Sequence, residues 1–355
     1  MATMHPNPLP DAHRPVRISD PGDLIAAIPA LLGFRPRRSL VAVCLGGGDP
    51  SVVRAVMRHD LPSGGIGPAD RDGLDRIALV CARGEVDSVV AVVVDDRAGR
   101  RGVHNALADE LGACLAEYEI PLIGAHALAE IAAAQRWRGL LGDSSRGVLP
   151  DPSSSEVAAA QVLGGRAIRD SREELEAVLD PDPARDRTRL AALIARSRDA
   201  GCAQAPPNRR VRLEFVLGRI ADRASAVIPT DDEIVELALA LADVRVRDAL
   251  LSLAVTDEAD AAEQLWIALA RALPDPDRAE AAALLGFSAY VRGDGPMAGI
   301  AFTAALRANP DHRLASLLDD ALQSGIRPES VCDLATTGRE IAARIGARMP
   351  PRRPR

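Results

Sequence analysis

Short apolar runs and longer amphipathic segments alternate along the first 130 residues. Four runs predict strands, because they are densely apolar or alternate in polarity: 39–45, 52–59, 88–94 and 120–123. Three segments with apolar residues three or four positions apart predict helices: 21–32, 69–82 and 103–118. Asp20 suits the cap of the first helix, and Gly33 suits its end. The N-terminal part is therefore predicted to be an α/β domain, a mixed sheet with flanking helices.

A stretch rich in glycine, serine, aspartate and proline, from Leu140 to Pro152, interrupts this alternation and predicts a hinge. Farther on, prolines separate segments of helical length, and Thr230 with Glu233 has the spacing of a capping box. The pattern there predicts an all-α helical bundle. We expect an α/β domain, a connecting segment with two short helices, a helical domain and a disordered tail, in this order: 16–139, 140–182, 183–347 and 348–355.

One window of the helical part is similar to a single tetratricopeptide hairpin. Counted from Ala279, small and large residues fall at the positions of that repeat: Leu285, Gly286, Ala298, Phe302, Ala305 and Pro310. Neighbouring windows do not repeat the pattern, and such arrays need about three units to be stable. Two interpretations stay open. The window is either an ordinary hairpin inside a bundle or a groove in which Trp266, Tyr290 and Phe302 bind a protein partner.

The chain has no lysine, so all 43 basic residues are arginine. Schiff-base chemistry, P-loop phosphate binding and protein-kinase chemistry each need a lysine amine and are excluded. The net charge is −7, and only two Trp, two Tyr and four Phe are present. A nucleic-acid binder needs a basic surface and aromatic stacking platforms, so no nucleic-acid partner is expected.

Five cysteines stand far apart without a C-x-x-C pair, which favours reduced thiols over disulfides or a zinc site. No metal or cofactor is expected. No apolar run approaches the roughly 18 residues of a membrane span, and residues 1–15 lack an apolar signal core. We therefore expect a cytoplasmic protein that does not enter a membrane. The sequence leaves its oligomeric state open.

Candidate chemistry lies where predicted strands end. Asp95 and Asp96 follow the run 88–94, and His59 and Asp60 close the run 52–59. The crevice beyond the carboxyl ends of strands is the usual ligand site of an α/β sheet. Carboxylates near a histidine could bind a cation or transfer protons. The alternative is structural, because aspartate at a strand end is also an ordinary turn residue.

Six separated blocks of sequence resemble one known family: Ile18–Leu24, Leu31–Pro36, Ser39–Val43, Asp60–Pro62, Ser171–Leu175 and Leu241–Asp248. In this order they are similar to the actinobacterial family known as domain of unknown function 4192. The resemblance implies no activity, substrate or catalytic residue. Members of that family often carry cysteines after an Arg-Trp pair. Here Arg136 and Trp137 are followed by glycine, aspartate and serine instead, so the resemblance implies no thiol or metal role for this chain.

These observations predict an interaction or regulatory protein without an identifiable catalytic motif, more in keeping with a binding protein than with an enzyme. A protein partner is expected to bind the helical half. The alternative is a small-molecule-binding or hydrolytic α/β domain with an acidic site at Asp95, Asp96, His59 and Asp60, governed by the helical part.

Overall fold

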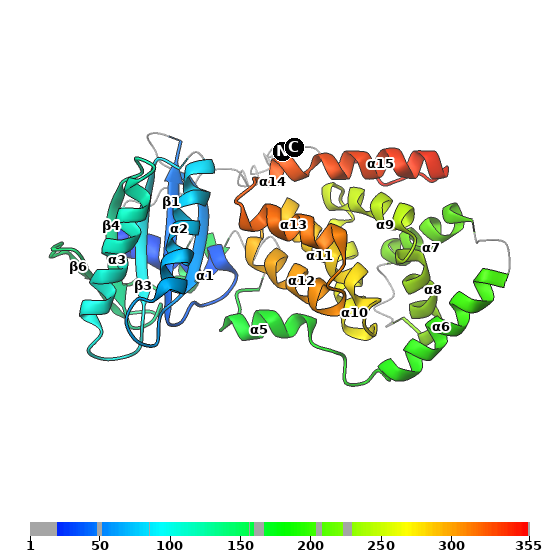
Figure 1. The fold of residues 1–355 in the computed structure, drawn as a ribbon, viewed down its shortest axis with the longest axis horizontal. Coiled ribbons are helices and arrows are strands. Elements are labelled where there is room, and N and C mark those ends of the chain that lie inside the picture. Colours follow the sequence, from blue (N-terminus) through cyan, green and yellow to red (C-terminus); the bar gives the residue numbers. More distant parts are fainter. Residues whose placement is uncertain are drawn as a thin grey trace, which may run out of the picture. The chain divides into compact units, whose positions relative to one another are not determined.

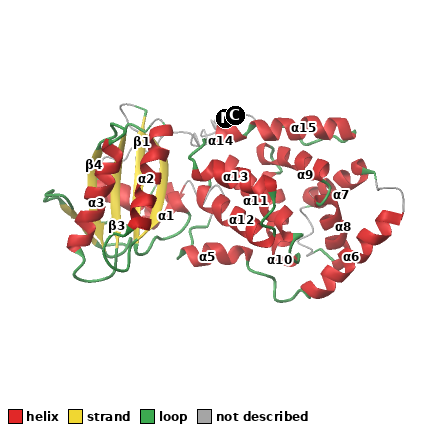
Figure 2. Cartoon of the chain, in the orientation of Figure 1, coloured by secondary structure: helices red, strands yellow, loops and turns green. Residues whose placement is uncertain are grey.

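The computed structural model describes residues 20–47, 52–84, 86–155, 157–159, 167–203, 208–222 and 229–353. The chain divides into two compact units (Figure 1). The first unit ends at Arg172, and the second begins at Glu173. In Figure 2 the strands, drawn in yellow, belong to the first unit. The predicted fold class is confirmed: a mixed sheet with helices is followed by an all-helical part.

The first unit is built around a mixed sheet, six-stranded in the described part of the chain. Its strands, in spatial order, are β2 (Val52–Asp60), β1 (Ser39–Gly46), β3 (Ser88–Val94), β4 (Leu122–Leu128), β5 (Arg136–Gly139) and β6 (Arg146–Val148). β3 and β4 are parallel, and the other neighbouring pairs are antiparallel. The turn that joins β1 to β2 includes residues 48–51, which lie outside the described residues.

Two helices pack on one face of this sheet: α2 (Pro68–Arg83) and α3 (Arg101–Ala116). Their apolar side chains, among them Leu74, Leu107 and Leu111, are fully buried against the inward-facing side chains of β1 and β3. This core contains valine, leucine, isoleucine, alanine and cysteine without an aromatic residue. The apolar residues three or four positions apart, which predicted these helices, therefore form the helix faces that are buried on the sheet.

Helix α1 (Pro21–Leu32) begins and ends at the predicted residues. Asp20 caps it, since its carboxylate accepts a hydrogen bond from the Gly22 backbone at 2.6 Å. Gly33 ends it with a φ of 75°, a left-handed conformation that glycine adopts without strain. Both signals act within a few residues, which is why the sequence predicts them well.

Strands β5 and β6 are absent from the sequence-based expectations. The stretch 140–152, expected to be an irregular hinge, contains β6, and β6 pairs with β5 through Arg146 opposite Arg138. Both strands are short, with four and three residues. A strand of this length at the edge of a sheet is held by its neighbour's hydrogen bonds, so its own sequence carries little signal.

The second unit is helical in the part that the structure describes. Its α-helices are α5 (Arg172–Glu176, at the boundary), α6 (Arg187–Ala203), α7 (Arg209–Ala221), α8 (Asp231–Leu241), α9 (Val244–Leu250), α10 (Ala259–Ala272), α11 (Arg278–Val291), α12 (Gly295–Ala308), α13 (Arg313–Gln323), α14 (Pro328–Val331) and α15 (Asp333–Ile345). The capping box is formed: the Thr230 hydroxyl accepts from the Glu233 backbone, and the Glu233 carboxylate accepts from the Thr230 backbone. None of the helices described here is long and apolar enough to cross a membrane.

Helices α11 and α12 form the expected hairpin, with the turn at Gly293 and Asp294. It lies inside the bundle. Trp266, Tyr290 and Phe302, named above as partner-binding candidates, are each at most 2 % exposed. These three side chains are part of the core and do not line an open groove. The tetratricopeptide character of the hairpin stays a prediction.

Candidate functional site: an arginine-lined pocket

A pocket opens at the carboxyl ends of the parallel strands β3 and β4, where the chain enters α3. Its volume is about 330 Å³. Five arginines line it, two from the segment between β3 and α3, one from the start of α3 and two from β5: Arg97, Arg100, Arg101, Arg136 and Arg138. Asp95 and His104 also line it. The pocket therefore lies where ligands usually bind in an open α/β sheet.

Backbone geometry brings these side chains together. The Asp95 backbone N–H donates to the Leu128 carbonyl at 2.9 Å, which extends the pairing of β3 with β4 by one residue. On β5, side chains alternate between the faces, so Arg138 lies on the face of its partner Ala127 and Trp137 lies on the other. Ala127 belongs to the core beneath α2 and α3. Arg138 is thereby placed next to the first turns of α3.

The Asp95 side chain is fully buried and holds several cationic groups. Its carboxylate accepts from Arg97 Nε at 2.7 Å, and its other oxygen lies 3.0 Å from His104 Nε2. Arg100 Nε lies 3.6 Å from the same carboxylate. Burial alone would raise the pKa of Asp95, but the hydrogen bonds from Arg97 and His104 outweigh it and lower the pKa to about 2. Asp95 is therefore an internal counter-ion.

Arg97 and Arg100 are held in place from a second side as well. Arg100 donates to the backbone carbonyls of Pro62, Ser63 and Gly64 at 2.7–3.0 Å. Arg97 donates to the Pro62 carbonyl at 3.2 Å. Both guanidinium groups thus tie the loop after β2 to the end of β3, and their donors are largely in use.

The remaining positive charge at the pocket is not compensated. Arg138 Nη2 lies 3.3 Å from His104 Nδ1, and Arg138 Nη1 is buried without a hydrogen-bond partner in the described structure. Burial lowers the pKa of Arg138, and the nearby charge of Arg101 lowers it further. Arg101 and Arg136 are exposed and form no ion pair with a described residue. The pocket therefore favours an anion.

The structure does not assemble the other predicted acidic residues into one site. Ser39 of β1 pairs with Asp60 on one side and with Val94 on the other, so β2 and β3 both end beside Ser39. Each side chain nevertheless has its own partner. Asp96 is exposed and pairs with Arg38 at 2.8 Å, Asp60 pairs with Arg58, and His59 Nε2 lies 3.4 Å from Asp70 on α2.

The charge of the site is therefore opposite to that of the acidic site that the sequence predicted. The carboxylates near the end of β3 are neutralised by arginines, and the unpaired charge at the pocket is positive. In the part of the chain that the structure describes, no group of three or more His, Cys, Asp or Glu side chains is placed to hold a metal ion.

Two features of the sequence correspond to the arginines of this pocket. Arginines stand at positions 97, 100 and 101, directly after the Asp95–Asp96 pair. The triplet Arg136-Trp137-Arg138 alternates between polar and apolar, which is typical of a strand with two arginines on one face. The two groups are separated by about 35 residues, so only the order of the strands shows that they meet.

Comparison with known proteins identifies the family. Residues 21–329 match the family described as Domain of unknown function (DUF4192). The chain belongs to this family. The match extends over both units of the chain, and the family description gives neither an activity nor a ligand. No curated protein and no solved structure matches the chain significantly.

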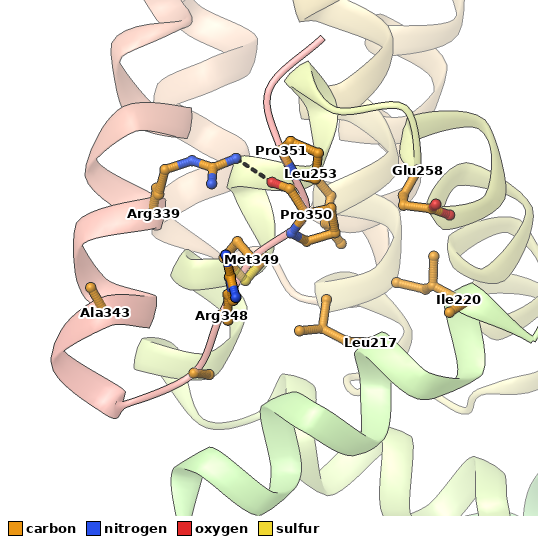
Figure 3. A pocket seen from close by; sticks show the side chains of 12 residues that line it. Leu217, Ile220, Leu253, Glu258, Arg339, Ala343, Arg348, Met349, Pro350 and Pro351 are labelled. Atoms are coloured by element: carbon orange, nitrogen blue, oxygen red, sulfur yellow. Dashed lines mark hydrogen bonds between the residues drawn. The ribbon is translucent and has the colours of Figure 1, made fainter.

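A second cavity, of about 760 Å³, lies in the helical unit (Figure 3). Its apolar wall includes Leu217 and Ile220 of α7 and Leu253, and residues 348–351 cover one side of it. Arg339 donates to the Pro350 carbonyl at 2.5 Å, the bond drawn in Figure 3. The cavity is thus bounded partly by the end of the chain.

The chain end differs from the expected disordered tail. Met349 is only 7 % exposed, the Arg353 backbone donates to the Val255 carbonyl at 2.8 Å, and Arg352 forms a β-bridge with Thr256. The sequence suggested a solvated tail because arginine and proline dominate it. One apolar side chain and the backbone hydrogen bonds nevertheless attach residues 348–353 to the bundle.

Proposed function

We propose that the α/β unit of this protein binds a small molecule that carries a phosphate group, in the arginine-lined pocket. The observation that carries the proposal is Arg138, whose Nη1 is buried without a partner while its charge faces that of Arg101. A buried donor without an acceptor destabilises a protein by roughly 1–3 kcal/mol, and more when it is charged. A phosphate oxygen would satisfy the donor and separate the two like charges.

Phosphate fits the pocket better than a single carboxylate does. Three arginines lack a carboxylate partner among the described residues, so a group with about two negative charges complements them better than a group with one: Arg101, Arg136 and Arg138. The planar guanidinium group binds phosphate oxygens through two parallel hydrogen bonds. Helix α3 begins at Arg101 without a side-chain cap, so its first backbone N–H groups are available to an anion as well.

The volume of about 330 Å³ lies at the lower end of the range of about 300–1,000 Å³ for ligand pockets. A phosphate and a small organic body fit this space. Asp95 does not contact the ligand in this proposal. It positions Arg97, Arg100 and His104, and its negative charge offsets part of the positive charge of the arginines.

Binding is favoured over hydrolysis. His104 is the only histidine in the pocket lining, and both of its ring nitrogens already contact Asp95 and Arg138. It has no lone pair directed toward a substrate or a water molecule, as a general base requires. Protein binding by the helical half, which the sequence suggested, stays a prediction, and the buried residues Trp266, Tyr290 and Phe302 do not support it.

The test measures thermal unfolding of the full chain and isothermal titration with inorganic phosphate and pyrophosphate. Sodium chloride at equal ionic strength is the reference. At a concentration of about 100 times Kd, a specific ligand stabilises the folded state by roughly 2.7 kcal/mol, which raises the unfolding temperature by a few degrees. An equal shift with chloride would contradict the proposal.

Two variants locate the site. Arg138→Gln is expected to abolish the phosphate-dependent shift, and Arg101→Gln, which removes an exposed side chain without an ion pair, is expected to weaken it at least tenfold in Kd. Arg210→Gln is the control, because it removes the same charge from α7, where Arg210 pairs with Glu214. Full phosphate binding by Arg101→Gln and Arg138→Gln together would show that the pocket is not the site.

A further inference from the structure

Two cysteines meet in the core of the α/β unit. The Sγ atoms of Cys44 on β1 and Cys81 on α2 lie 3.4 Å apart, although 37 residues separate them in the chain. Cys44 is fully buried, and Cys81 is 1 % exposed. Neither forms a disulfide in this structure. The pair lies apart from the arginine-lined pocket, because neither cysteine lines it.

The two sulfurs are chemically distinct. The hydrogen bond between them lowers the pKa of Cys81 against the effect of burial, whereas the same bond and burial both raise the pKa of Cys44. Of the two sulfurs, Cys81 is therefore the one on which a thiolate is favoured. A thiolate beside a thiol is the arrangement in which the thiolate attacks an oxidant and the second sulfur resolves the product.

We propose that Cys44 and Cys81 form a reversible disulfide that joins the inner strand β1 to the last turn of α2. A disulfide needs an S–S distance of about 2.05 Å, so the sulfurs must approach by a little over 1 Å. Cys81 lies in the final turn of α2, which ends at Arg83. Helix ends open at low free energy, and this opening gives a small oxidant access to the pair.

The oxidant that fits a buried site is a small peroxide. The Cys81 thiolate attacks one oxygen of hydrogen peroxide, the O–O bond breaks, and hydroxide leaves and takes up a proton to become water. The product is a sulfenic acid on Cys81. The Cys44 sulfur then attacks the Cys81 sulfur, the S–O bond breaks, and the second oxygen leaves as water. Two thiols lose two electrons and two protons, and one peroxide becomes two waters.

The lysine-free sequence makes the product easy to identify. Trypsin cleaves this chain only after arginine, so Cys44 lies in the peptide 39–54 and Cys81 in the peptide 77–83, each with a single cysteine. The full-length protein is treated with hydrogen peroxide, its remaining thiols are blocked with N-ethylmaleimide, and the digest is analysed by mass spectrometry. We expect these two peptides joined, with a mass two hydrogens below their sum, and separated again by dithiothreitol.

The oxidised protein is expected to unfold at a temperature several degrees higher, because the bond closes a long loop in the unfolded chain. Cys114→Ser is the control. Cys114 is buried elsewhere in the core, burial raises its pKa to about 12, and its removal should leave the linked peptides unchanged. Maleimide on both Cys44 and Cys81 after peroxide treatment and unfolding would overturn the proposal, as would a link from either one to Cys114 in equal yield.

Discussion

A Cβ atom on Gly286 of α11 would lie 2.4 Å from Cε1 of Phe302 on α12. No side chain fits at that distance, so the absence of a side chain on Gly286 lets the two helices approach. The ring of Phe302 fills the space, and Tyr290 contacts it edge to face with the ring centres 6.4 Å apart. This contact is the centre of the hairpin that the sequence predicted.

Replacement of Phe302 by alanine is expected to lower the free energy of unfolding by roughly 3–5 kcal/mol, because a fully buried aromatic ring leaves a cavity. Urea denaturation followed by circular dichroism measures the change. Leu317→Ala is the control, since Leu317 is 68 % exposed on α13 and should change stability by about 0.5 kcal/mol or less. Equal effects of the two substitutions would contradict the burial of Phe302.

Gly286→Ala should also be destabilising, although alanine is the better helix former by about 1 kcal/mol. The added methyl group meets the Phe302 ring, and overpacking of this kind lowers stability by roughly 1–3 kcal/mol. Gly299→Ala on α12 is the matched control, because its added Cβ lies 3.6 Å from Leu322, an ordinary contact. Thermal unfolding should place Gly299→Ala at or above the parent protein and Gly286→Ala below it.

Asp95→Asn is expected to destabilise the α/β unit by roughly 3 kcal/mol. The substitution keeps the shape of the side chain but leaves Arg97 and Arg100 without their buried counter-charge. Asp96→Asn removes an exposed ion pair with Arg38 and should change stability by less than about 1 kcal/mol. Denaturant titration at neutral pH distinguishes the two, and comparable losses would show that Asp95 is not the counter-ion of the pocket.

The same carboxylate predicts part of the acid sensitivity. The folded-state pKa of Asp95, about 2, lies below the value of about 3.9 in an unfolded chain. Its stabilising contribution is therefore complete above about pH 4 and is lost as the pH falls toward 2. We expect the free energy of unfolding to fall less steeply between pH 4 and pH 2 in Asp95→Asn than in the parent protein. Parallel curves would contradict the lowered pKa.

Removal of residues 348–355 is expected to lower the stability of the helical unit by about 2 kcal/mol, the approximate contribution of one buried methionine, here Met349. The apolar wall of the cavity beside Leu217 and Leu253 should become accessible, which binding of a hydrophobic fluorescent dye would report. Arg353→Gln is the control, because its ion pair with Asp257 is exposed. Unchanged unfolding and dye binding after the truncation would mean that the chain end does not cover the cavity.

Part of the candidate site followed from the sequence. Asp95 was identified because it comes directly after an apolar run, a position that is local in the chain. The role of Asp95 as a counter-ion does not follow from the sequence, because the charged residues around it come from separate elements of the fold. His104 lies on α3. Arg138 follows Asp95 by 43 positions and lies on β5, a strand too short to be predicted. These partners neutralise Asp95 and leave the unpaired charge of the pocket positive.

The sequence by itself determined the strands β1, β2 and β3, the helices α1, α2 and α3, and the helical hairpin that contains Gly286 and Phe302. Periodicity, capping and the placement of small residues act over a few positions, so a single chain segment carries their signal. Only the tertiary structure decided that β5 lies beside β4, that Cys44 contacts Cys81, and that residues 348–353 attach to the bundle. Such contacts join segments that are far apart in the chain, and their free energy depends on the packing of the whole unit, which no local pattern contains.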